Sequence, residues 1–220
     1  MSSSNHVNRH PLPALTIGVM GSAGGVISAD VRQKVRRLGE EIGRRRYILI
    51  TGAAPGLPHD AVLGAKSTGG FVIGISPALN LVEHVNKYHS PTYGYDAMIY
   101  TGSGLMGREI ENIRSCDVVI FAGGRSGTLG EFAIAYDEGK VIGALSGTGG
   151  VTDHLDEIIT IMQKKTTAII TYNPDPIALL DDLERIYSQQ ILPGYLRTIA
   201  GHNGDGLLET ANVDTLNLPA

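Results

Sequence analysis

The sequence predicts an α/β protein, a Rossmann-like doubly wound and mostly parallel sheet of about seven strands with helices on both faces. Short apolar runs alternate with longer segments of helical periodicity along most of the 220 residues, which is the order of elements in such folds. The apolar runs are continuous rather than alternating, as in strands buried on both faces. The 29 glycines without a collagen period indicate many tight turns between strands and helices.

The strands are expected wherever a continuous apolar run is bounded by turn residues. They are residues 14–20, 47–52, 71–76, 97–102, 116–124, 141–146 and 167–172. The helices are expected where apolar residues recur every three or four positions. They are residues 28–46, 59–67, 79–85, 104–115, 126–139, 153–165 and 175–190. Ser28 is placed to cap the first helix, and Pro176 suits the first turn of the last one.

Three segments are expected along the chain. We expect residues 1–13 to form a disordered leader and residues 14–191 to form a single nucleotide-binding domain. Residues 192–220 are expected to form an irregular C-terminal tail, because apolar residues no longer recur at helical spacing after Pro193. No repeat or linker divides the central segment.

Composition argues against several function classes. A net charge of −4 and a pI near 5.9 are unlike the basic surface of a nucleic-acid-binding protein. No apolar run approaches the roughly 18 residues that span a bilayer, so no membrane partner is expected. The first residues lack the apolar core of a signal peptide, which predicts a cytoplasmic protein. A single cysteine excludes an internal disulfide framework.

The expected strands end in glycine-rich turns. In open parallel sheets, ligands bind outside the carboxyl ends of the strands, where the strand order reverses. Gly21 and Ser22 follow the first strand and Gly52 ends the second, and all three are candidate phosphate- or nucleotide-binding residues. Neither turn fits the dinucleotide fingerprint G-x-G-x-x-G, and the P-loop pattern is absent, so a standard NAD site or P-loop is not expected.

The turn after the fifth strand is the most informative. It reads GGRSGTLGE, in which glycines free the backbone and hydroxyls stand at the start of a helix, where unpaired N–H groups bind anions. Its candidate phosphate-binding residues are Gly123, Gly124, Arg125, Ser126, Gly127 and Thr128. Glu131 lies one turn further along the same side of the helix, either as a functional carboxylate or as a favourable charge near the helix N-terminus.

A second cluster precedes the fifth strand. Arg108 and Asn112 lie four residues apart, on one helical face. They either reach the same crevice or form a surface pairing with Glu109 or Glu111.

Together these clusters resemble the LOG family, the cytokinin riboside 5′-monophosphate phosphoribohydrolases once labelled lysine-decarboxylase-like. They are also similar to the related molybdenum-cofactor carrier proteins. The family pattern is an arginine on the helix before strand five, followed by P-G-G-x-G-T-x-x-E, and here Arg108 precedes Gly123 to Glu131. The resemblance extends from about Leu15 to Tyr187.

The resemblance implies a function and roles for these residues. Gly124, Gly127 and Thr128 would hold a phosphate, and Arg108 and Glu131 would be the catalytic pair in cleaving the N-glycosidic bond of a nucleoside 5′-monophosphate. It implies no metal and no cofactor, and it implies a homodimer or higher homo-oligomer.

The chain also departs from the pattern. Gly123 replaces the family's proline, Arg125 its second glycine and Gly130 its first glutamate. The altered turn is closer to the carrier-like branch. A non-catalytic protein that binds or carries a nucleotide or molybdenum cofactor is therefore the alternative function, and the expected ligand is AMP-like or of molybdopterin type.

Overall fold

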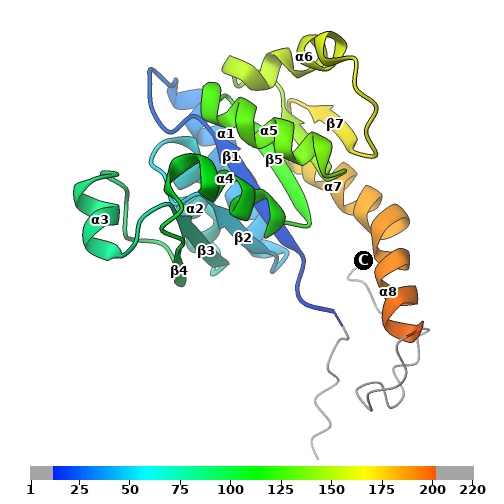
Figure 1. Ribbon diagram of the computed structural model, residues 1–220, viewed down its shortest axis with the longest axis horizontal. Helices are drawn as coiled ribbons and strands as arrows, with labels where there is room; N and C mark the ends of the chain where they lie inside the picture. Colours follow the sequence, from blue (N-terminus) through cyan, green and yellow to red (C-terminus); the bar gives the residue numbers. More distant parts are fainter. Residues whose placement is uncertain (1–11, 202–220) are drawn as a thin grey trace, which may run out of the picture.

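The computed structural model describes residues 12–201, so the predicted leader and most of the predicted tail lie outside the described residues. Seven strands form one parallel sheet in the order β4-β3-β2-β1-β5-β6-β7 (Figure 1). The strands are β1 (Thr16–Gly21), β2 (Ile48–Thr51), β3 (Phe71–Ser76), β4 (Ala97–Tyr100), β5 (Val118–Ala122), β6 (Val141–Leu145) and β7 (Ile169–Asn173). The predicted doubly wound α/β fold is confirmed.

Helices connect the strands. They are α1 (Ala29–Arg44), α2 (Leu57–Ser67), α3 (Leu81–Asn86), α4 (Gly104–Arg114), α5 (Ser126–Asp137), η1 (Gly150–His154), α6 (Leu155–Met162), α7 (Pro176–Ile186), η2 (Tyr187–Ile191) and α8 (Leu192–Gly201). Ser28 caps α1 as predicted, because its Oγ accepts a hydrogen bond from Val31 N. At the start of α7, the side chain of Asp175 accepts hydrogen bonds from two backbone amides.

The strand order reverses at β1, which pairs with β2 on one side and with β5 on the other. From β1 the chain moves outward through β2, β3 and β4, and then returns to β5 on the opposite side. The connections that leave β1 and β5 therefore diverge, and the crevice between them is the ligand position that this class of sheet favours.

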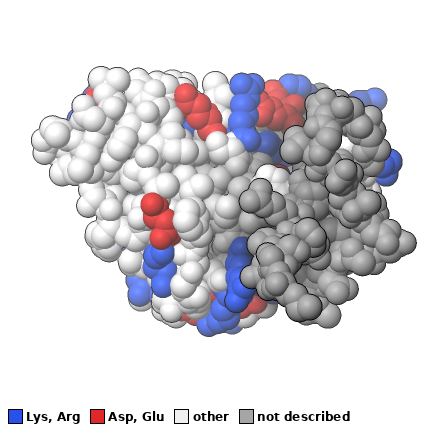
Figure 2. All heavy atoms as spheres, turned by 90° about the horizontal axis from the view of Figure 1, so that it is seen from below, with Lys and Arg blue, Asp and Glu red and all other residues white. Residues whose placement is uncertain are grey.

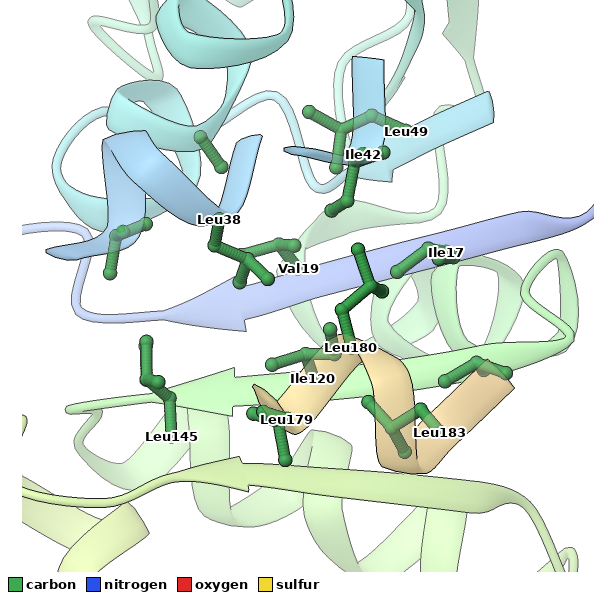
Figure 3. Close-up of a cluster of buried hydrophobic side chains, with 14 of the residues drawn as sticks. Ile17, Val19, Leu38, Ile42, Leu49, Ile120, Leu145, Leu179, Leu180 and Leu183 are labelled. Atoms are coloured by element: carbon green, nitrogen blue, oxygen red, sulfur yellow. The ribbon is translucent and has the colours of Figure 1, made fainter. Parts of the chain in front are cut away.

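One face of the sheet is covered by α1, α2 and α7. Alternate residues of β1 point to this side, and Ile17 and Val19 pack with Leu38 of α1 and Leu180 of α7 (Figure 3). These side chains are fully buried or nearly so. This core fixes the direction of β1 and hence the position of the turn that follows it.

The opposite face is covered by α4, α5 and α6. Met20 and Phe121 point to this side, and Phe132 of α5 meets Phe121 edge to face with ring centroids 5.7 Å apart. Helices α4 and α5 lie side by side on this face (Figure 1). Their packing brings the two predicted clusters, one on each helix, next to each other.

The C-terminal part of the described chain differs from the prediction. We expected irregular structure from residue 192, but Leu192–Gly201 is helical. A five-residue π-helical segment, η2, connects α7 to α8. Its wider turn accommodates Pro193, whose ring would clash with the preceding turn of a regular helix. We took that proline as the end of the helical pattern, and this was wrong for the first ten residues of the tail.

The surface of the described residues carries mixed charge. On the face shown in Figure 2, acidic and basic side chains are interspersed among wide uncharged areas. Among residues 12–201, no helix is both long enough and apolar enough to cross a membrane.

Candidate functional site

The turns after β1 and β5 are tied together across the crevice. Ser22 Oγ accepts a hydrogen bond of 2.6 Å from Gly124 N. The carbonyl of Ser22 accepts another, of 2.9 Å, from the N–H of Leu57 at the start of α2. Gly21 approaches β5 so closely that an ideal Cβ would lie 2.1 Å from the carbonyl oxygen of Ala122. The structure thus places Ser22 at the junction of three elements, while Gly21 permits the close contact between β1 and β5.

The β5 turn is held from the other side by two threonines that the sequence analysis missed. Gly123 N donates a 2.8 Å hydrogen bond to Thr148 Oγ1, and Thr152 Oγ1 donates a 2.7 Å bond to the carbonyl of Gly123. Thr148 lies within the glycine-rich stretch GTGG after β6, and Thr152 follows that stretch by two residues. That stretch was a usable signal, because it ends a strand at the same edge of the sheet.

Gly124 requires the absence of a side chain. Its φ angle is +102°, in the region that favours glycine. An ideal Cβ there would lie 2.5 Å from Cβ of Thr128, which is buried. The turn therefore folds directly onto the first turn of α5.

The start of α5 offers free hydrogen-bond donors. Within residues 12–201, the N–H groups of residues 125–128 have no hydrogen-bond acceptor, and no side chain caps the helix. These groups carry the partial positive charge of the helix N-terminus. Ser126 and Gly127 are exposed beside them. The arrangement is suited to binding an anion.

Arg125 immediately precedes this helix. Its side chain is exposed, and its Nη2 lies 3.4 Å from the position of an ideal Cβ at Gly24, in the β1 turn. Among the described residues it forms no ion pair within 4.0 Å. This guanidinium adds an unpaired positive charge beside the free amides.

Behind the helix start, Arg108, Asn112 and Glu131 form a buried cluster. Glu131 Oε1 accepts from Arg108 Nη1 at 3.1 Å and from Asn112 Nδ2 at 3.3 Å. Arg108 is 8% exposed and Glu131 6%. The surface pairing of Arg108 with Glu109 or Glu111, which the sequence left open, is therefore wrong: Arg108 points inward from α4 to α5.

Gly52 completes this cluster from the end of β2. An ideal Cβ at Gly52 would lie only 1.9 Å from Arg108 Nη1, so the guanidinium packs directly on the backbone there. We placed Gly52 among the residues that contact the ligand, and in the structure its contact is with Arg108. Arg108 Nε and Asn112 Oδ1 are buried and have no partner among the described residues, so the cluster retains hydrogen-bonding capacity.

The carboxyl group of Glu131 is strongly perturbed. Burial raises its pKa from 4.5 to about 7, the nearby Arg108 guanidinium opposes that rise, and Glu109 reinforces it. A carboxyl group with such a pKa exchanges its proton near neutral pH, as general acids and bases require. Strong perturbation of this kind beside an anion site is typical of functional residues.

Comparison with known proteins shows the family to which this chain belongs. The sequence profile described as the SLOG cluster4 family matches residues 14–179. The chain belongs to this family. The LOG-like resemblance, close to the molybdenum-cofactor carrier branch, is thereby confirmed.

Individual relatives of this SLOG protein include one from Archaeoglobus fulgidus, described as an uncharacterized protein. It is 33% identical over 131 residues, which cover 60% of this chain and 80% of the relative. The X-ray structure of TM1055 matches with a TM-score of 0.68 at 25% identity, covering 78% of this chain and 99% of that protein. The molybdenum cofactor binding protein from Rippkaea orientalis matches with a TM-score of 0.65 at 28% identity, covering 80% and 98% respectively.

Proposed function

We propose that this SLOG protein binds the phosphate group of a small molecule between the ends of β1 and β5, and there hydrolyses the N-glycosidic bond of a nucleoside 5′-monophosphate. One observation carries the proposal. Glu131, held by Arg108 and Asn112, lies one helical turn behind the free amides of residues 125–128.

The phosphate would be bound by the N-terminal amides of α5, by the hydroxyls of Ser126 and Thr128, and by the guanidinium of Arg125. Backbone amides at a helix start bind anions without any further cation, because the helix dipole adds to their partial charges. Gly124 and Ser22 hold the turn in the shape that directs these amides toward the crevice.

The chemical step would take place next to Glu131. The bond between C1′ and the base nitrogen breaks, its electron pair leaves with the base, and positive charge develops on the ribose. A carboxylate close to this centre stabilises that charge. A water molecule then adds its oxygen to C1′ and releases a proton, which Glu131 accepts, while the departing base takes up a proton from the solvent. The products are the free base and ribose 5-phosphate. Arg108 orients the Glu131 carboxylate.

A second candidate is a non-catalytic protein that binds or carries a phosphorylated ligand, such as molybdenum cofactor or a nucleotide. Two observations favour it. The Rippkaea protein, 28% identical, is a molybdenum cofactor binding protein. The exposed Arg125 guanidinium lies over the β1 turn, where it suits a ligand larger or more anionic than a nucleoside monophosphate.

We also propose that the protein acts as a cytoplasmic homodimer. Exposed apolar side chains gather on the adjacent helices α4 and α5, namely Leu105, Met106, Ile110 and Leu129. Burial between two copies would remove this surface from water. A molar mass from light scattering that corresponds to one chain would contradict the dimer.

The experiment that separates the two functions uses AMP and a panel of other nucleoside monophosphates. We expect release of free base, measured by liquid chromatography, and loss of that release in Glu131→Gln. Glu138→Gln is the matched control, because Glu138 terminates the same helix and pairs with Arg114. Thermal stabilisation by a monophosphate without any base release would favour the binding protein.

A further inference from the structure

The carboxylate of Glu109 lies against the first turn of α5. An ideal Cβ at Gly130 would lie 2.7 Å from Glu109 Oε2, and one at Gly127 would lie 3.3 Å from Oε1. Residues three apart lie on one face of a helix. The two glycines therefore form a bare strip on α5, and the Glu109 carboxylate packs on it.

This strip adjoins both parts of the candidate site. Gly127 contributes one of the four free amides at the helix start. Thr128 and Glu131, which each follow a glycine of the strip by one residue, lie on the adjacent face of α5. On α4, Glu109 directly follows Arg108. The Glu109 carboxylate thus lies beside the anion-binding helix start on one side and the buried Arg108–Glu131 pair on the other.

The groups around the Glu109 carboxylate have opposing effects on its ionisation. Its side chain is half-buried, and the part of the chain that the structure describes offers its carboxylate no hydrogen bond or ion pair. Burial raises the pKa of Glu109, and Arg108 on its own helix opposes that rise. Across the helix pair, Glu109 in turn raises the pKa of Glu131.

An ionised carboxylate and a phosphate cannot share this place without mutual repulsion. A protonated carboxyl group, in contrast, is a hydrogen-bond donor to a phosphate oxygen. The bare strip of Gly127 and Gly130 gives Glu109 room to turn toward the helix start.

We propose that Glu109 is a proton-linked residue of the phosphate site: it takes up a proton when the phosphate binds and donates that proton in a hydrogen bond to the ligand. The inference rests on the proposed phosphate binding, and it holds whether the protein is a hydrolase or a carrier. Since the pKa of Glu109 is higher in the complex than in the free protein, affinity is greatest at low pH and falls as pH rises, by up to about tenfold per unit from this group.

The structural alternative is that the ionised carboxylate merely stabilises the N-terminus of α5 through the helix dipole. The two roles differ in proton uptake: a carboxylate that stays ionised takes up no proton when phosphate binds, whereas the proposed Glu109 takes up one. A glutamine amide donates a hydrogen bond at every pH and carries no charge. If the proposal holds, the variant binds phosphate more tightly than the wild type at pH 8.

The test is calorimetric titration with inorganic phosphate and with AMP between pH 6 and pH 8, in buffers that differ in ionisation enthalpy. We expect the wild type to take up more protons than Glu109→Gln, and the variant to show a flatter pH dependence. Glu111→Gln is the matched control: Glu111 lies on the same helix but is exposed and bonded to Ser103. The ionisation of the ligand is common to all variants, but Glu109 also raises the pKa of Glu131. The comparison is therefore repeated in a Glu131→Gln background, where the difference in proton uptake reports on Glu109 alone.

Gly130→Ala provides the second variant. Its Cβ would displace the Glu109 carboxylate, while alanine stabilises a helix relative to glycine. We expect undiminished thermal stability together with altered proton uptake. Equal proton uptake in wild type and Glu109→Gln overturns the role of Glu109 and leaves the phosphate site intact. If the wild type binds neither phosphate nor AMP, the phosphate site itself is refuted.

Discussion

The Glu131→Gln variant tests the burial of this carboxyl group through the pH dependence of stability. In the folded protein its pKa is about 7, against 4.5 for an ordinary glutamate. Between these values the folded state holds a proton that the unfolded state has released. The resulting stabilisation is complete below pH 4.5 and is lost as pH rises through about 7.

The magnitude follows from the size of the shift. Each pKa unit corresponds to 1.36 kcal/mol, so the wild type should lose roughly 2–3 kcal/mol of unfolding free energy between pH 5 and pH 8 through this group alone. Glutamine keeps the shape but does not titrate. The difference between wild type and variant should therefore change by that amount, even though removing one partner of a buried pair also destabilises the variant by a constant term.

Urea unfolding followed by circular dichroism at pH 5, 6, 7 and 8 measures this difference. Glu138→Gln, at the far end of α5, should parallel the wild type. A difference between wild type and Glu131→Gln that stays constant over this range would refute the argument, because Glu131 would then remain ionised throughout and could not exchange protons near neutral pH.

Three further substitutions test the architecture of the site. Gly52→Ala should displace the guanidinium of Arg108 from its buried pair with Glu131, reducing base release or ligand affinity by about tenfold or more and lowering the melting temperature. Gly124→Ala introduces a Cβ at positive φ and into Thr128, so urea titration should show a loss of about 2–4 kcal/mol. Ser22→Ala leaves the N–H of Gly124 without its acceptor, and we expect a loss of about 1–2 kcal/mol together with weaker phosphate binding in thermal shift measurements.

Local patterns were sufficient to predict most of the elements. The continuous apolar runs located all seven strands. Burial on both faces explains this for the five inner strands, whereas the edge strands β4 and β7 are apolar although they are only partly buried. Ser28 marked the start of α1 through the chemistry of its hydroxyl. The prediction of irregular structure after Pro193 was wrong because a proline ends only a regular helix. The pattern of apolar residues does not predict the wider π-helical turn of η2.

The site was predictable to the extent that it depends on sequence spacing. The free amides of α5 follow from a glycine turn that opens a helix, and Arg108 and Asn112 share a face because they are four residues apart. Their approach to Glu131 depends on how α4 packs against α5, which no local pattern specifies. The contact of Gly52 with Arg108 and the position of Glu109 on the strip of Gly127 and Gly130 likewise arise only from tertiary packing.

The packing of α4 against α5 explains how two departures from the LOG pattern change the charges at the start of α5. Gly130 stands where the family has a glutamate, and in this chain a carboxylate from the neighbouring helix, that of Glu109, packs on the bare position. Arg125 stands where the family has a glycine, and its guanidinium extends over the β1 turn. The first change brings a titratable group to the helix start from α4, and the second adds a fixed positive charge there. Both groups lie at the helix start, where we propose that the anion binds, and Glu109 also raises the pKa of Glu131. We therefore expect substitutions at Arg125 and Glu109 to change which ligand binds and at what pH, and substitutions at Glu131 to change whether the bound ligand reacts.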